Sequence, residues 1–348
     1  MLMRLDTRMT MRYSTKGNQI KVAARVWIII VNYRTPGLVI DCLHSLAPEV
    51  GQAGGIRVAL VDNASGDGSE VKLREGIAKN GWSPWVELLP QRRNGGFAYG
   101  NNAGIAAALL QSPGPDYIML LNPDTIVRPG AIIALAEFLD HRPEVGIVGG
   151  QLENADGSVE PSAHNAPSAL GELESAARLA LLSRWLLRHQ VTPPRRTDAH
   201  QCDWVSGASM MVRRTLIDAI GTMDDRFFLY FEEVDFCSRA RNAGWQVWFE
   251  PGSRVVHLEG ASTGIGQTIR RRPAYWFDSR RRYFVKHRGV AGLLLADICW
   301  LLGRTSLAAR RALRLGRGGT RQDPPWFTVD LLWGDLKALC TLKLRNIR

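Results

Sequence analysis

Short apolar runs rich in β-branched residues alternate with helical patterns along the first half of the chain, and this alternation constrains the fold most. The first run, VWIIIV at residues 26–31, is apolar at every position, as expected for a strand buried on both faces of a sheet. Similar runs are found at residues 57–61, 85–89, 117–121 and 145–148, and helices are expected between them at 36–46, 69–80, 101–110 and 129–140. The spacing predicts βαβ units, and therefore an α/β, Rossmann-like domain with a mostly parallel sheet flanked by helices.

The second half of the chain is less regular. A helical stretch at residues 168–189 leads into a proline- and arginine-rich linker. Strands are expected at 204–212, 227–231, 245–249 and 255–257, with a short helix over 232–242.

The formal net charge of +11 is carried by the two ends of the chain. Residues 270–348 contain 18 lysines and arginines against five acidic residues, and residues 1–25 contain six against one. The residues between them therefore carry a net charge of −7, and an acidic body of this kind argues against a nucleic-acid partner. Basic ends on an acidic body favour contact with an anionic surface, of which the inner leaflet of a membrane is the commonest.

These patterns divide the chain into three expected parts: a basic, disordered leader at 1–25, a central domain at 26–288, and a basic amphipathic helical extension at 289–348. Residues 289–315 are apolar with basic residues toward their end. An interfacial helix at a membrane fits this segment, as does a helix packed on the core or on a second subunit. No window of 18 consecutive apolar residues is present, so a typical spanning helix is not expected.

Polar residues cluster where the predicted strands end. Asn32 and Tyr33 follow the first strand, Asp62 and Asn63 follow the second, and residues 122–124 follow the fourth. Parallel sheets bind ligands at the carboxyl ends of their strands. The same residue types are also common in simple turns, so the recurrence at three strand ends carries the argument.

Acidic and imidazole side chains at three places in the sequence could carry chemistry. Asp124 could hold a divalent cation beside a diphosphate, since such ions take carboxylate and phosphate oxygens. His257 could complete a metal site, although a single histidine is more often structural. The acidic cluster of Glu232, Glu233 and Asp235 could match a helix dipole or contain a general base. The sequence has no P-loop, dinucleotide fingerprint or nucleophile elbow, and its five cysteines form no CxxC pair.

The ordered set of these motifs resembles the inverting glycosyltransferases of family 2, which have the GT-A fold. The set comprises Asn32-Tyr33, Asp62-Asn63-Ala-Ser65, Asn94-Gly-Gly-Phe97, Asn101-Asn-Ala-Gly104, Asn122-Pro-Asp124, Trp204-Val-Ser-Gly-Ala208, Glu232-Glu-Val-Asp235 and His257. Within the family the chain looks most like bacterial rhamnosyltransferases of cell-surface polysaccharide synthesis. The match covers roughly residues 25–290.

The resemblance implies a role for each motif. The nucleotide-sugar pocket would be lined by Asn32, Tyr33, Asp62, Asn63, Asn94, Gly95, Gly96, Asn101 and Asn122. Asp124 and His257 would hold Mg²⁺ or Mn²⁺, with Asn122 standing where the family has the first acidic residue of its metal motif. Trp204 and Gly207 would lie on the acceptor side.

The resemblance also implies the reaction. Glu233 would be the catalytic base, with Asp235 in reserve and Glu232 next to the acceptor. The donor would be a nucleotide sugar, with dTDP-rhamnose as the leading candidate and UDP-linked hexose or galactofuranose as alternatives. The acceptor would be a glycan or a lipid-linked saccharide, and the enzyme would lie in the cytoplasm on the inner face of the plasma membrane. A non-catalytic nucleotide-sugar-binding protein of the same fold is the alternative that the unusual residues Asn122 and Glu233 leave open.

Overall fold

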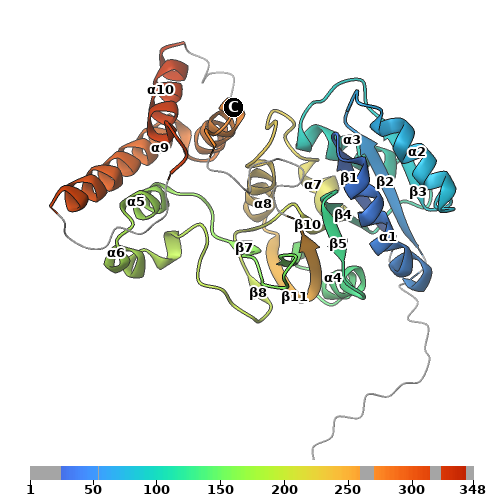
Figure 1. Cartoon of the computed structure of the whole chain (residues 1–348). Coiled ribbons are helices and arrows are strands. Elements are labelled where there is room, and N and C mark those ends of the chain that lie inside the picture. Colours follow the sequence, from blue (N-terminus) through green and yellow to red (C-terminus); the bar gives the residue numbers. More distant parts are fainter. Residues whose placement is uncertain (1–24, 54, 259–269, 314–322, 342–348) are drawn as a thin grey trace, which may run out of the picture.

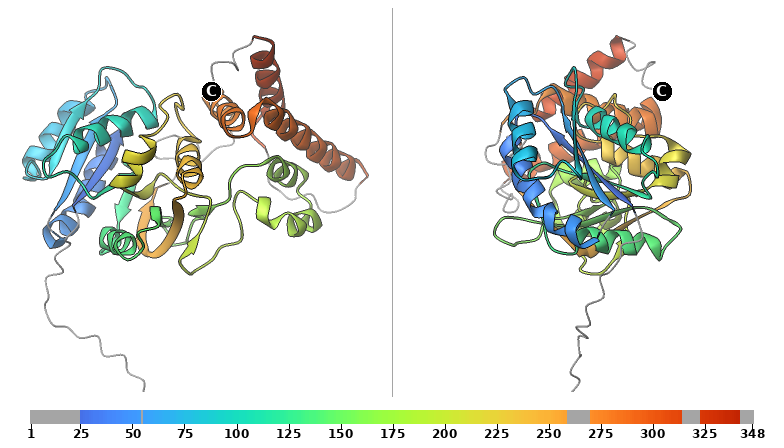
Figure 2. Two further views of the ribbon diagram at one scale, coloured as in Figure 1. Left: turned by 180° about the vertical axis from the view of Figure 1, so that it is seen from behind. Right: turned by 90° about the vertical axis from the view of Figure 1, so that its right-hand side faces the viewer.

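The computed structural model describes residues 25–53, 55–258, 270–313 and 323–341. The predicted leader at 1–25 lies, apart from its last residue, outside the described residues. Figure 1 shows a sheet with helices on both faces, and a group of C-terminal helices at the end of the molecule farthest from the first strands. The left view in Figure 2 shows the same separation of the early strands from the C-terminal helices.

The central sheet has nine strands in the described part of the chain. Their order is β3-β2-β1-β4-β10-β6-β11-β5, and β8 pairs with β11. The strands are β1 (Val26–Asn32), β2 (Ile56–Asp62), β3 (Val86–Pro90), β4 (Tyr117–Leu121), β5 (Thr125–Val127), β6 (Val145–Glu153), β8 (His200–Gln201), β10 (Ser209–Arg213) and β11 (Gln246–His257). The first four sheet strands in this order are parallel, as are β6 and β11, whereas β10 runs antiparallel to both of its neighbours. The sheet is therefore mixed at its centre and parallel where the first strands end.

Helices cover both faces of this sheet because its central strands are apolar on both sides. Alternate residues of β1 belong to two separate core clusters, with Ile28 in one and Ile29 in the other. One cluster includes residues of α1 (Pro36–Ala53), α2 (Ser69–Lys79) and α4 (Ala131–Asp140). The other includes residues of α3 (Phe97–Leu109), α7 (Arg214–Ile220) and α8 (Glu232–Asn242). The predicted α/β class with a flanked, mostly parallel sheet is confirmed.

One predicted strand is absent and another is interrupted. The aromatic segment 227–231 forms no strand, because Tyr230 and Phe231 adopt left-handed backbone conformations and the chain turns directly into α8. Its aromatic side chains pack on the C-terminal helices instead, with Phe231 against Trp276. The predicted strand at 204–212 is split into β9 (Trp204–Val205), which pairs with β7 (Ala163–His164), and β10. Tertiary packing outweighs the β-propensity of both segments.

The C-terminal helices bend back onto the sheet domain. Here α9 (Ala274–Ala312) is interrupted at Gly289, whose φ of 69° turns the chain, and α10 (Phe327–Cys340) follows. The second half of α9 packs on α5 (Ala169–Ala177) so closely that a Cβ on Gly303 would lie 2.8 Å from the Leu173 carbonyl oxygen. A short helix α6 (Ala180–Trp185) and a 3-10 turn (Leu187–His189) complete this group. The interruption at Gly289 coincides with the predicted domain boundary, which remains a prediction.

A buried ion cluster joins these helices. The Arg280 side chain is 1% exposed and contacts three carboxylates, those of Glu172 on α5, Asp297 in the second half of α9 and Asp335 on α10, at 3.0–3.2 Å. A buried charge is tolerated only when it is paired in this way. The cluster therefore fixes α5, both halves of α9 and α10 relative to one another.

One of the described helices, α9, is long and apolar enough to cross a membrane by length and composition alone. This differs from the prediction that no such segment is present. However, Asp297 is ion-paired with Arg280, and Leu293, Ala296 and Leu307 are buried against the protein. Only one side of the helix is therefore available to a membrane.

Candidate functional site

The ends of β1 and β2 are joined by a buried polar network. The parallel register pairs Asn32 with Asp62. The Asn32 amide donates to Asp62 Oδ1 at 2.7 Å and to Ser65 Oγ at 3.1 Å, and Ser65 Oγ donates to Asp62 Oδ1 at 2.5 Å. Asn32 Oδ1 in turn accepts from the Thr35 backbone N–H and hydroxyl. Asn32 thus holds the Asp62 carboxylate in place at the strand end, where a bound nucleotide would meet it.

The next polar group links β2 to the glycine loop before α3. The Asn63 amide donates to Asn94 Oδ1 and to the Gly96 carbonyl, both at 3.0 Å. Asn94 Oδ1 also accepts from the Gly96 N–H at 3.0 Å. Asn63 Oδ1 is buried with no hydrogen-bond partner in the structure, so an acceptor remains there for a ligand.

Gly96 allows this loop to touch the segment that precedes α8. Its φ is 91°, and a Cβ on it would lie 1.9 Å from the Phe228 carbonyl oxygen. That same oxygen accepts from the Phe97 N–H at 2.8 Å. No side chain larger than hydrogen fits, both sterically and because of the backbone conformation. The predicted nucleotide loop and the predicted base-bearing segment are therefore in direct contact.

The remaining residues of the predicted nucleotide pocket differ in how far a ligand could contact them. The Tyr33 ring is 39% exposed, with the Arg34 guanidinium 5.0 Å from its centroid, so one of its faces could stack on a base. Asn101 is buried, and its amide donates to the Phe97 carbonyl within α3. A Cβ on Gly95 would collide with the Tyr99 ring, which shows that the backbone is tightly packed there. Asn101 supports the loop from behind in this arrangement.

The predicted metal ligands lie together. His257 pairs with Thr125 across β11 and β5, and this pairing brings the imidazole beside Asp124. Nε2 of His257 is 3.6 Å from Asp124 Oδ1 and 3.4 Å from the Asn122 amide nitrogen. The Nδ1 atom on the other side of the ring is 3.5 Å from Glu160 Oε2.

The chemistry of this group fits a divalent cation that is completed by substrate. Asp124 is 1% exposed, and Asn122 Oδ1 is buried without a hydrogen-bond partner in the described parts of the chain. Among the described residues, no group of three or more histidine, cysteine or acidic side chains is arranged to hold a metal by itself. Mg²⁺ is often held by only one or two carboxylates together with substrate phosphates. Asp124 and His257 could supply the protein's share of such a site.

Glu232 and Glu233 begin α8 with carboxylates that lack full solvation. Oε2 of each is buried with no hydrogen-bond partner in the structure. Burial raises the pKa of Glu233 to about 6. Burial and the neighbouring Glu233 charge raise the pKa of Glu232 well above its usual range. A carboxylate with a pKa near 6 can accept a proton at neutral pH.

Asp235 has a different environment. It is fully buried, and its carboxylate contacts Lys286 Nζ at 2.7 Å, His287 Nε2 at 2.8 Å and Arg239 Nε at 3.0 Å. Burial would raise the pKa of Asp235, but these partners outweigh burial and hold it below its usual value. The geometry favours Glu233 over Asp235 as a base, and Asp235 as the residue that ties α8 to α9.

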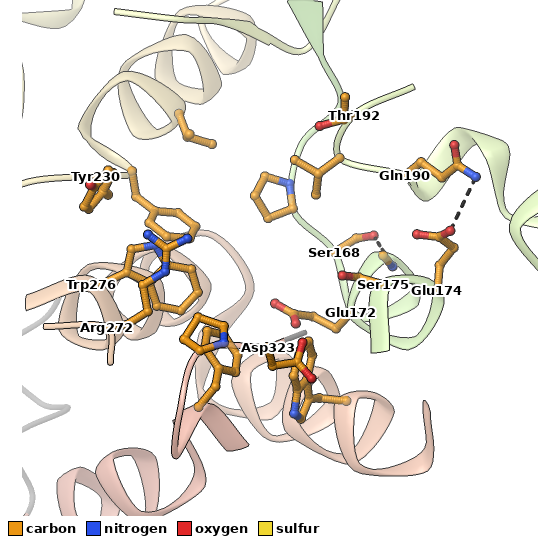
Figure 3. A pocket seen from close by; sticks show the side chains of 18 of the residues that line it. Ser168, Glu172, Glu174, Ser175, Gln190, Thr192, Tyr230, Arg272, Trp276 and Asp323 are labelled. Atoms are coloured by element: carbon orange, nitrogen blue, oxygen red, sulfur yellow. Dashed lines mark hydrogen bonds between the residues drawn. The ribbon is translucent and has the colours of Figure 1, made fainter. Parts of the chain in front are cut away.

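Glu233 lies at a cavity of about 880 Å³ that Trp204 also lines. Gly207 is beside it, since a Cβ on that glycine would be 3.7 Å from Glu233 Cβ. The Trp204 ring stacks on His164 at a centroid distance of 4.1 Å and donates to the Asn165 carbonyl. Figure 3 shows the cavity between α5 on one side and Tyr230, Arg272 and Trp276 on the other. The residues predicted for the acceptor side and for the base thus share one cavity.

The sequence model of the glycosyltransferase-like family 2 matches residues 24–277. The chain belongs to this family. An N-acetylglucosaminyl-diphospho-decaprenol L-rhamnosyltransferase of Mycobacterium tuberculosis is 30% identical to this chain over 271 residues. The aligned region covers 74% of this chain and 83% of the relative. The hexosyltransferase Agl10 of low-salt glycan biosynthesis in Haloferax volcanii is 24% identical over 214 residues, which cover 62% and 61% of the two chains.

Solved structures support the fold of this family 2 glycosyltransferase. A mannosyltransferase of Pyrobaculum calidifontis, solved with GDP-mannose and Mn²⁺, superposes with a TM-score of 0.53 at 17% identity, covering 91% of this chain and 81% of the other. The predicted GT-A fold is confirmed. The protein is a nucleotide-sugar-dependent glycosyltransferase, as predicted.

Sequence reasoning missed several neighbours of the site. Glu160 follows β6 in a loop that carries no motif, and only the fold places it next to His257. The carbonyl group of Phe228 contacts the glycine loop through its backbone, so its side-chain type carries no signal. Arg272 and Trp276 belong to a segment that reaches the cavity only because α9 folds back on α8.

Proposed function

We propose that this enzyme transfers a sugar with inversion of configuration to a hydroxyl group of a lipid-linked saccharide in cell-surface polysaccharide synthesis. Rhamnose from dTDP-rhamnose is the leading donor, supported by the mycobacterial rhamnosyltransferase that is similar over most of the chain. The observation that carries the proposal is Glu233, a partly buried carboxylate with a raised pKa at the edge of an open cavity.

Glu233 would act as the general base. It accepts the proton of the acceptor hydroxyl as that oxygen forms a bond to the anomeric carbon. The bond from the anomeric carbon to the phosphate oxygen breaks in the same step, and its electron pair leaves with the nucleoside diphosphate. A single displacement of this kind inverts the anomeric centre and needs no covalent intermediate.

The other residues of the site would bind and orient the donor. Asp62, held by Asn32 and Ser65, would bind the ribose or base, and the glycine loop would lie along the nucleotide. Asp124 and His257 would hold Mg²⁺ or Mn²⁺. When bound, the cation would neutralise charge on the departing diphosphate.

Donor turnover tests this function. The purified enzyme is incubated with Mg²⁺, a membrane lipid extract and a panel of dTDP-, UDP- and GDP-sugars, and the release of nucleoside diphosphate is measured. Release from dTDP-rhamnose, dependent on the lipid extract, is the expected result. Release from a UDP-hexose or UDP-galactofuranose alone would show that this sugar nucleotide, and not dTDP-rhamnose, is the donor. Tight nucleotide binding without release from any donor would favour a non-catalytic binding protein, for which the unusual Asn122 and Glu233 are the observations in favour.

We further propose that the enzyme lies on the cytoplasmic face of the membrane through its C-terminal helices. An exposed apolar stripe runs along the second half of α9, and another runs along α10. Their residues are Val290, Leu294, Leu295, Ile298, Leu301 and Leu302 on α9, and Trp326, Val329, Trp333 and Leu336 at α10. The spacing of three or four residues places each set on one helix face. Arg311 and Lys337 are exposed nearby, which suits an anionic bilayer.

Charged substitutions on these stripes should weaken membrane binding. Leu302→Glu combined with Trp333→Glu is expected to lower binding to phosphatidylglycerol vesicles at least ~10-fold, because each apolar side chain contributes roughly 1.5–3 kcal/mol when buried. Vesicle co-sedimentation measures this. Val71→Glu is the matched control, since Val71 is equally exposed on α2, away from both stripes. Unchanged vesicle binding with a change in oligomeric state would instead assign the stripes to a contact between two copies.

A further inference from the structure

The cavity beside Glu233 is separate from the predicted donor pocket. Its walls come from α5, the start of α8, the start of α9 and the segment that leads into α10. Of the predicted site residues, only Trp204 and Glu233 line it, whereas none of the nucleotide-pocket or metal residues does. A ligand in this cavity would therefore reach the base without occupying the predicted donor pocket.

Apart from Glu233, the acidic residues that line the cavity already have partners. Glu172 is paired with the buried Arg280 at 3.0 Å. Asp323 is paired with Arg178 and with Arg304. Glu174 accepts from the Ser183 hydroxyl at 2.6 Å, and Figure 3 shows its contact with Gln190. These contacts reduce the negative field that the carboxylates present to a ligand.

Two arginines of the cavity have no such partner among the described residues. Arg270 and Arg272 both line it, and neither forms an ion pair with a carboxylate in the part of the chain that the structure describes. Arg271, between them, points elsewhere and forms a bidentate pair with Asp330, with Nε 2.8 Å from Oδ2. Arg270 and Arg272 therefore lie on the cavity side of the segment before α9, and Arg271 lies on its other side, toward α10. Two guanidinium groups that have no carboxylate partner among the described residues therefore face one cavity.

An aromatic wall adjoins these arginines. The Arg272 guanidinium lies 5.9 Å from the Trp276 ring centroid, and Figure 3 shows the two side chains together. The Phe327 ring centroid lies 5.3 Å from that of Trp276 and 5.0 Å from that of Trp300. All three rings line the cavity. Aromatic faces can pack on the C–H faces of a sugar ring or on an isoprenoid chain, whereas arginine pairs are suited to phosphate oxygens.

We propose that Arg270 and Arg272 bind the diphosphate of the acceptor, so that the acceptor is a saccharide joined to its lipid through a diphosphate. The sugar then lies between the aromatic wall and Glu233, with its hydroxyl directed to the base. This inference rests on the proposed transferase function and adds the anionic subsite that selects its acceptor. The donor is the other possible source of a diphosphate, and the test separates the two.

The test compares two acceptor probes and four forms of the enzyme. The probes are N-acetylglucosaminyl diphosphoryl farnesol and octyl N-acetylglucosaminide, which lacks the diphosphate. The enzymes are the wild type, R270Q/R272Q, R270K/R272K and the matched control R271Q. For the diphosphate probe, R270Q/R272Q should raise the acceptor KM on the order of 100-fold, because each arginine–phosphate contact is charge-assisted. The donor KM and the KM for the octyl glycoside should change less than about twofold, the lysine variant should recover part of the affinity, and R271Q should behave as the wild type.

Equilibrium binding tests the arginine subsite independently of the proposed transferase function. The affinity of each form for the diphosphate probe is measured by calorimetry without donor, and thermal unfolding checks that the variants are folded. Binding that R270Q/R272Q abolishes, in an enzyme that transfers no sugar, would support the subsite while contradicting the proposed function. A rise in donor KM, with acceptor binding unchanged, would assign the arginines to the donor. Equal binding by all four forms, or no binding by the wild type, would overturn the inference.

Discussion

Glu233→Gln is expected to lower kcat by ~10²–10⁴-fold while leaving the affinity for the nucleoside diphosphate unchanged. The amide keeps the shape of the side chain but cannot accept the acceptor's proton, and general-base catalysis contributes an effect of this size. Glu233 lies at the cavity and not at the strand ends where the nucleotide would bind, so donor binding should be insensitive to the change. Steady-state kinetics and calorimetric titration with nucleoside diphosphate measure the two effects.

The pH profile gives an independent signature of the same group. Because burial raises the pKa of Glu233 to about 6, kcat should rise with pH through about 6 as the carboxylate loses its proton. This rise of kcat with pH should be absent in the glutamine variant. Glu87→Gln is the control, because Glu87 is exposed on β3. It should keep both the wild-type kcat and its rise with pH. If Glu233→Gln retains turnover within a few-fold, a different base operates, and Glu232 would be the next to test.

Asp124→Asn should remove metal-dependent turnover. Its carboxylate is buried 3.6 Å from His257 and would be the main acidic ligand, since Asn122 supplies only an amide. Stabilisation of the diphosphate by a metal is worth several kcal/mol, so a loss of at least ~10²-fold in kcat is expected. Chelation of the wild type with EDTA should give the same loss, and adding Mg²⁺ or Mn²⁺ should restore it only in the wild type.

Metal affinity provides a readout besides activity. Electron paramagnetic resonance of Mn²⁺, titrated in the presence of nucleoside diphosphate, should show weaker binding in Asp124→Asn. Asp116→Asn is the matched control because it lies at the opposite end of the same strand, in a half-exposed pair with Arg25. Full activity of the wild type in EDTA, together with wild-type behaviour of Asp124→Asn, would contradict a metal at this position.

The local elements of the sheet domain could be predicted from the sequence. The run 26–31 is apolar at every position, which only a strand covered on both faces tolerates, and the structure places β1 at Val26–Asn32. The strand at 117–121 was predicted with its observed bounds for the same reason. Polar residues at the ends of such strands meet at one edge when neighbouring strands are parallel. Asn32, Asp62 and the glycine loop could therefore be grouped before any coordinates were known.

The contacts between distant segments could not be predicted in the same way. The aromatic segment 227–231 has the composition of a strand, yet packing on α9 turns it into the irregular entry of α8 that positions Glu233. Glu160 reaches His257, and Arg272 reaches the cavity, through contacts between segments far apart in the chain.

Sequence by itself determined where the buried strands lie, the order in which the motifs follow one another, and the residue types at the strand ends. These features depend on the local hydrophobic pattern and on side-chain chemistry. Only the tertiary structure decided that Asp235 is neutralised by Lys286 and His287, while Glu233 Oε2 has no hydrogen-bond partner among the described residues. The two carboxylates are separated by one residue and look equivalent in the sequence. Their difference arises from which side of α8 faces α9, since a carboxylate's pKa and role depend on the charges and solvent around it.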